Sequence, residues 1–165
     1  MRLIKVILPG AILKSGFWLY VWIVRMPSGR KVLYVGRTGD SSSSNAAPPY
    51  RRLGQHLGMA KASNALRTHI SNRKISPESC MDFQFIAYGP LFKKQLNMKA
   101  HMPVRDKVAA LEKALADSLR ESGYDVLNHV NCRKKLDQRL WSTVRRVFVR
   151  HFPMLGVKVR RTKKT

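Results

Sequence analysis

Residues 17–36, FWLYVWIVRMPSGRKVLYVG, carry the strongest structural signal in the chain. Its two halves, 17–25 and 30–36, are rich in aromatic and β-branched residues, which favour β-strands. Between them, residues 26–29 (MPSG) place Pro and Gly at positions that suit a tight turn. This stretch therefore predicts an antiparallel hairpin.

After the hairpin, the sequence changes from strand-like to helical spacing. Residues 50–59 follow two prolines and predict a helix, and residues 64–72 predict a second one. Residues 82–88, DFQFIAY, then alternate between apolar and polar side chains. Such alternation predicts a third strand.

The C-terminal half predicts two further helices. One covers 107–121, where Asp106 is the expected N-cap and Gly123 the expected stop. The other is a basic amphipathic helix over 133–151, whereas residues 91–105 give no clear pattern. The predicted fold is α+β, with a small antiparallel or mixed three-stranded sheet, flanking helices and a basic C-terminal helix.

Length and charge narrow the class of protein. A chain of 165 residues is typical of one domain, here a core over 1–130 extended within the same compact unit by a basic helix and tail over 131–165. There are 32 Lys and Arg against 9 Asp and Glu, a formal net charge of +23. Such a surface favours a polyanion, with DNA as the first candidate, RNA as the second and an anionic membrane as the weakest.

The cellular setting follows from what the sequence lacks. Apolar runs near the N-terminus are short or interrupted, as in 3–13 by Lys5 and Pro9, so neither a membrane span nor a signal peptide is expected. Cys80 and Cys132 form no ligand pattern or disulfide framework. We expect an intracellular, cytoplasmic protein with reduced thiols.

Five short motifs follow one another along the chain. They are LYV at 19–21, YVGRT at 34–38, RLGQH at 52–56, LEKAL at 111–115 and VLN at 126–128. In this order and spacing they resemble the GIY-YIG nuclease family over roughly residues 17–130. Trp18-Leu19 stand where the family name has Gly-Ile, while the tyrosine is kept as Tyr20.

The resemblance implies a DNA endonuclease that hydrolyses phosphodiester bonds with one Mg²⁺ or Mn²⁺ ion. The catalytic residues that it implies are Tyr20, Tyr34, Arg52, His56, Glu112 and Asn128. Tyr20 or Tyr34 would activate water, and His56 or the second tyrosine would move a proton. Arg52 would stabilise charge on the phosphate, Glu112 would hold the metal, and Asn128 would close the family core.

The chemistry of these residue types agrees with that assignment. Mg²⁺ is commonly held by one or two carboxylates with waters, so Glu112 suffices in principle, with Asp106 or Asp117 as the reserve ligand. Arg52 and His56 are four residues apart on a helix and therefore share a face. Tyr20 and Tyr34 face the same side of the sheet in one of the two possible registers.

A second set of residues is predicted to bind nucleic acid through phosphates. Residues 129–165 contain a single acid, Asp137, among many Lys and Arg, more asymmetry than solubility requires. The predicted contacts are Arg37, Arg51, Arg133, Lys134, Lys135, Arg139, Arg145, Arg146 and Arg150. Two rivals remain, namely a DNA-binding protein without catalysis and a basic RNA-associated protein. The nuclease would act as a monomer or as a transient dimer on DNA.

Overall fold

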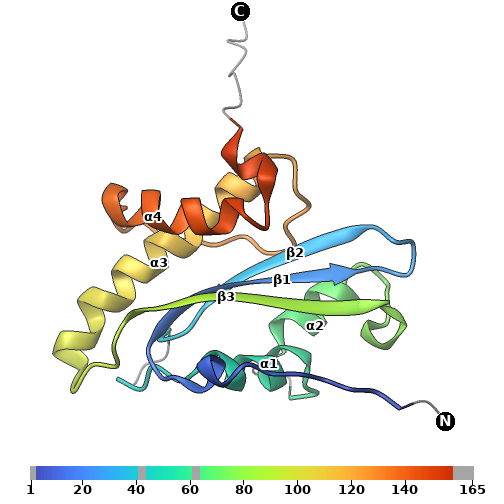
Figure 1. Cartoon of the computed structure of the whole chain (residues 1–165), viewed down its shortest axis with the longest axis horizontal. Coiled ribbons are helices and arrows are strands. Elements are labelled where there is room, and N and C mark those ends of the chain that lie inside the picture. Colours follow the sequence, from blue (N-terminus) through green and yellow to red (C-terminus); the bar gives the residue numbers. More distant parts are fainter. Residues whose placement is uncertain (1–2, 41–43, 61–63, 158–165) are drawn as a thin grey trace, which may run out of the picture.

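Three antiparallel strands form the centre of the molecule (Figure 1). The computed structural model describes residues 3–40, 44–60 and 64–157. The strands are β1 (Phe17–Arg25), β2 (Lys31–Arg37) and β3 (Asp82–Phe92), in the order β2-β1-β3. The predicted α+β class is confirmed, and the sheet is antiparallel throughout.

Helices cover both faces of this sheet within the described ranges (Figure 1). They are α1 (Pro49–Leu57), α2 (Ala65–Ser71), α3 (Met98–Glu121) and α4 (Gln138–Val149), with short 3-10 turns at Gly10–Leu13, Pro77–Ser79 and Pro153–Gly156. α3 and α4 lie on one face, and α1 and α2 on the other. None of the helices in this part of the chain is long and apolar enough to cross a membrane.

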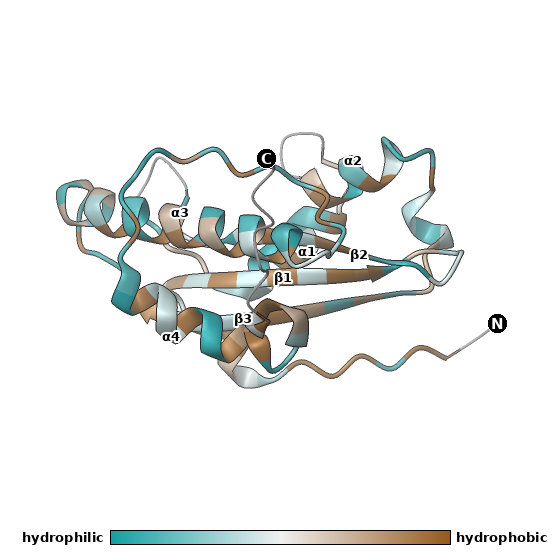
Figure 2. Ribbon diagram, turned by 90° about the horizontal axis from the view of Figure 1, so that it is seen from above, coloured by the Kyte–Doolittle hydropathy of each residue, from teal (hydrophilic) through white to brown (hydrophobic). Residues whose placement is uncertain are grey.

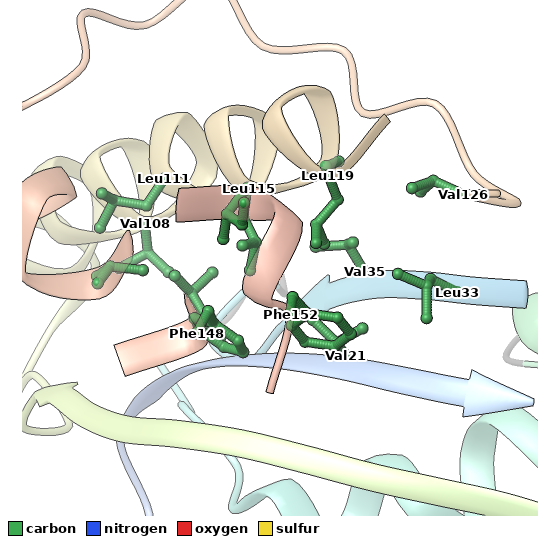
Figure 3. Close-up of a cluster of buried hydrophobic side chains, with 14 of the residues drawn as sticks. Val21, Leu33, Val35, Val108, Leu111, Leu115, Leu119, Val126, Phe148 and Phe152 are labelled. Atoms are coloured by element: carbon green, nitrogen blue, oxygen red, sulfur yellow. The ribbon is translucent and has the colours of Figure 1, made fainter. Parts of the chain in front are cut away.

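Alternation along the strands divides the core into two halves. Leu19 and Val21 of β1 pack toward α3 and α4, in the cluster drawn in Figure 3. Tyr20 and Trp22 pack toward α1 and α2. A sheet buried on both faces requires nearly continuous apolar strands, which explains the unbroken run at 17–24.

α3 starts earlier than the sequence predicts. It begins at Met98 rather than Lys107, and its N-cap is Asn97, whose side chain accepts a backbone hydrogen bond at 3.0 Å. Asp106, the predicted cap, lies inside the helix. The added turns are anchored by His101, which is fully buried with its ring 4.9 Å from that of Phe17. This long-range contact has no local sequence signal.

Two other elements also differ in length from their predictions. α4 begins at Gln138 because the Asp137 carboxylate accepts a hydrogen bond from a backbone N–H of the first turn at 3.1 Å, so residues 133–135 precede the helix. β3 continues through Pro90 to Phe92. Proline is tolerated there because β3 is an edge strand and its pairing with β1 is irregular between Tyr88 and Phe92.

The segment after α3 covers the outer edge of β2. The Leu33 N–H donates to the Asp125 carbonyl at 2.8 Å, and the Leu127 N–H donates to the Leu33 carbonyl at 2.7 Å. Asn128 continues the pairing with its side chain. Its Oδ1 accepts from the Val35 N–H at 3.0 Å, and its Nδ2 donates to the Val35 carbonyl at 2.8 Å. A buried amide thus takes the place of a neighbouring strand.

We predict that Asn128→Ala destabilises the fold by about 2–3 kcal/mol, because both backbone groups of Val35 lose their partner in a buried setting. Urea unfolding monitored by circular dichroism measures this change. Asn131→Ala, at an exposed position on the same segment, is the matched control and is expected to be neutral. Equal unfolding midpoints for the two variants would contradict the structural role of Asn128.

Candidate active site

A cavity of about 390 Å³ opens beside the C-terminal end of β2. Side chains from β1, β2, α1, α2 and α3 line it, so segments distant in sequence meet there. Five residues of the predicted catalytic set are among them, namely Tyr20, Tyr34, Arg52, His56 and Glu112. Asn128 is the exception, because its side chain is hydrogen-bonded to the Val35 backbone at the edge of β2.

Strand register brings the two tyrosines to this cavity. Tyr20 pairs with Gly36, and Trp22 pairs with Tyr34, so both tyrosines lie on the face toward α1 and α2. The Tyr20 ring crosses directly over Gly36, where an added Cβ would lie 2.4 Å from ring atoms. The glycine of the YVG motif is therefore a steric requirement of the Tyr20 position.

Tyr20 and His56 form a buried hydrogen-bonded pair. The Tyr20 hydroxyl lies 2.7 Å from His56 Nε2, and both side chains are almost fully buried. Burial raises the pKa of Tyr20 well above its ordinary value. Burial and the nearby Arg52 guanidinium lower the pKa of His56 to about 4. Both groups are neutral at pH 7, and in the tautomer protonated on Nδ1 the phenol donates and Nε2 accepts.

Tyr34 extends this aromatic group toward α2. Its ring centroid lies 4.9 Å from that of His56 and 5.7 Å from that of His69. Burial and the Glu112 carboxylate raise the pKa of Tyr34 to about 12. His69 also lines the cavity, and burial lowers its pKa. No sequence pattern identifies His69 as a site residue, since no spacing links it to the others.

The charged residues of the cavity are paired with one another. Arg52 forms an ion pair with Asp40 and donates to Gln55 Oε1 at 3.1 Å. Arg37 Nε lies 2.8 Å from Glu112 Oε2. The lining thus holds two arginines and two carboxylates, with a formal sum of zero, in a chain of net charge +23. Asp40 carries no motif that would have identified it.

Glu112 is the residue best placed to hold a cation. Its side chain is only 14% exposed, and burial raises its pKa although Arg37 and Arg52 act in the opposite direction. Among the described residues, no group of three or more His, Cys, Asp and Glu could enclose a metal. A lone carboxylate suits Mg²⁺ or Mn²⁺ that keeps water and shares a phosphate, and it does not suit zinc.

The reserve metal ligands lie elsewhere. Asp106 pairs with Lys134 at 2.8 Å, and Asp117 pairs with Lys113 and with Arg120. Neither carboxylate belongs to the cavity lining. The structure therefore leaves Glu112 and Asp40 as the carboxylates at this position.

The predicted phosphate-binding residues do not form one group around the cavity. Arg37 lines it, whereas Arg51 borders a separate apolar groove beside the N-terminal segment. α4 lies over the β3 side of the sheet (Figure 2). Phe148 of α4 packs on Tyr88 of β3, with ring centroids 6.4 Å apart. The cavity lies beside β2, at the edge of the sheet opposite to β3.

The basic residues in and before α4 differ in their exposure and in their hydrogen bonds. Arg139 and Arg146 are exposed on α4, and Arg150 is exposed at its C-cap. Arg133 and Lys135 are exposed in the segment before it. Arg145 is half-buried and donates to the Leu155 carbonyl at 3.1 and 2.6 Å, so its role is structural. The basic tail over 158–165 lies outside the described residues.

Comparison with protein-family models, with curated proteins and with solved structures found no match to this chain.

Proposed function

We propose that this chain is a metal-dependent endonuclease that hydrolyses DNA phosphodiester bonds through a GIY-YIG-type site. One observation carries the proposal. The motif resemblance selects Tyr20, Tyr34, Arg52, His56 and Glu112 from four separate motifs in the sequence, and all five line one cavity. Most other arrangements of the same elements would scatter these side chains over different surfaces.

The Tyr20–His56 pair suits the role of general base. A neutral imidazole can accept the phenolic proton through Nε2 while the phenolic oxygen takes a proton from an attacking water. The water oxygen then bonds to phosphorus, and the P–O bond to the leaving oxygen breaks. The leaving oxygen takes a proton from a solvent water, and the protonated His56 returns its own proton to solvent. The lowered pKa of His56 keeps this acceptor unprotonated well below pH 7.

Arg52 and Glu112 are the residues proposed to stabilise the negative charge of the phosphate. Arg52 presents a planar guanidinium that can bind two phosphate oxygens, in exchange for its present contact with Asp40. Glu112 would hold the cation, which supplies Lewis-acid stabilisation of the phosphate charge when bound. A cavity of zero formal charge can accept a phosphodiester and a divalent cation together.

DNA is the proposed substrate because of the charge of the whole chain. A net charge of +23 favours a polyanion through counterion release. The exposed arginines of α4 offer phosphate contacts away from the cavity. The alternative is a DNA-binding or RNA-binding protein without catalysis. It is favoured by Trp18-Leu19 in place of Gly-Ile. It is also favoured by the two ion pairs that already occupy the site, Arg52 with Asp40 and Glu112 with Arg37.

We predict that the chain nicks or linearises supercoiled plasmid at low salt when Mg²⁺ or Mn²⁺ is present. Arg52→Ala and Glu112→Gln are each expected to lower the rate by at least about 100-fold, because each removes charge stabilisation at the phosphate. Gel assays under single-turnover conditions measure this effect.

Arg67→Ala is the control for this assay, because Arg67 pairs with Glu78 outside the cavity lining, and it is expected to cut like the unsubstituted chain. A plasmid that is bound but uncut with every metal tested, including when it carries branched or single-stranded regions, would favour the alternative of binding without catalysis.

His56 gives a prediction on pH. Its folded-state pKa of about 4 lies below its ordinary 6.5, so lowering the pH through this window favours the unfolded chain. His56 should therefore reduce the free energy of unfolding by about 2 kcal/mol between pH 7.5 and pH 5. Urea unfolding at the two pH values, compared with His56→Gln, isolates this contribution. An identical pH dependence in both proteins would refute it.

The exposed face of α4 gives a prediction on salt. Substituting Arg139, Arg146 and Arg150 by Gln should lower DNA affinity and reduce the slope of log K against log salt by about 2–3, because three phosphate contacts are lost. Fluorescence anisotropy with duplex DNA measures the slope. The charge-matched control replaces the exposed Lys93, Lys94 and Lys99. Equal losses in both triple variants would show that α4 has no special role.

A further inference from the structure

Arg37 of β2 forms an ion pair with Glu112, the proposed metal ligand. We propose that Arg37 holds the Glu112 carboxylate only while no divalent cation is bound, and turns to the substrate phosphate when a cation takes its place. This inference rests on the proposed function of the cavity. It makes Arg37 a residue that couples metal binding to substrate binding.

The geometry of the pair supports an exchangeable contact. Arg37 uses a single nitrogen, Nε, on one oxygen of Glu112, and its buried Nη1 has no hydrogen-bond partner among the described residues. Arg73 is different, since its Nη1 and Nη2 bind both oxygens of Asp125 at 2.7 Å each. A lasting ion pair would use the guanidinium fork fully, as Arg73 does.

The unpaired Nη1 of Arg37 suggests that this side chain binds an anionic ligand. A buried N–H without an acceptor costs free energy, which a ligand can recover by supplying one. Arg37 lies in the lining of a cavity proposed to take a phosphodiester, so a turn of its side chain would bring this nitrogen to the ligand. A phosphate oxygen is the acceptor that an arginine fork binds best.

Charge makes the two partners of Glu112 compete. A guanidinium and a divalent cation repel each other at contact distance, and both seek the same carboxylate oxygens. A cation on Glu112 therefore weakens the hold on Arg37. The guanidinium then needs a new anion, and the phosphate beside the metal supplies it.

The backbone at Arg37 is fixed, so the exchange involves the side chain alone. The next residue, Thr38, is fully buried, and its Oγ1 accepts from the Trp18 N–H at 2.9 Å and donates to the Gly16 carbonyl at 2.6 Å. The adjoining cavity gives the long arginine side chain room to turn. No strand or helix has to move.

The test measures Mn²⁺ binding to the full chain without DNA, from the electron paramagnetic resonance signal of free Mn²⁺. We expect Arg37→Gln to bind Mn²⁺ about tenfold more tightly than the unsubstituted chain, because the competing cation is gone. Arg73→Gln, which loses the same charge from an ion pair outside the cavity lining, should bind as the unsubstituted chain does. Glu112→Gln should bind no Mn²⁺ at this site.

A second measurement, of DNA affinity with and without Ca²⁺, tests whether Arg37 binds the substrate phosphate when a cation is present. Ca²⁺ should strengthen binding of uncut duplex DNA to the unsubstituted chain, and Arg37→Gln should lose about fivefold in affinity with Ca²⁺ but little without it. Thermal unfolding checks that each variant is folded.

The outcomes separate this inference from the proposed function. Mn²⁺ binding that needs Glu112 but is unchanged or weaker in Arg37→Gln would overturn the exchange alone, and so would a DNA-affinity loss that ignores Ca²⁺. Absence of Mn²⁺ binding in every folded variant would overturn both the exchange and the metal site.

Discussion

The register between β1 and β2 is the constraint on which the site depends. Strand side chains alternate, so a slip of one residue would turn Tyr20 away from α1 and toward α3. The pairing of Tyr20 with Gly36 opposes this slip, because only glycine leaves space for the crossing ring. Helices pack on both faces of β1, and the cavity opens on the face that carries Tyr20.

Burial and charge act together around the cavity. The surface of the chain is strongly basic, yet the cavity balances its arginines with Asp40 and Glu112. Removal from water keeps the Tyr20–His56 pair neutral and makes unpaired charge costly. A site of this kind can exchange its internal ion pairs for external ones, and that property suits a phosphate ligand that arrives with a cation.

Most of the fold could be predicted from local pattern. The order of three strands and four helices follows from apolar periodicity, turn residues and prolines, and the described structure agrees with it. The errors lie at element ends. Asn97 rather than Asp106 caps α3 because the buried His101 fixes the preceding turns, and Pro90 remains within a strand because that strand lies at an edge.

The α+β class and the strongly basic charge could be read from periodicity and composition, and the motif resemblance selected five of the side chains that line the cavity. The packing of distant segments was needed to show that Asn128 supports β2, that Asp40 and His69 join the cavity, and that α4 lies over the β3 side of the sheet. The reason is physical. Those relations depend on register and on contacts between residues far apart in the chain, and local pattern carries neither.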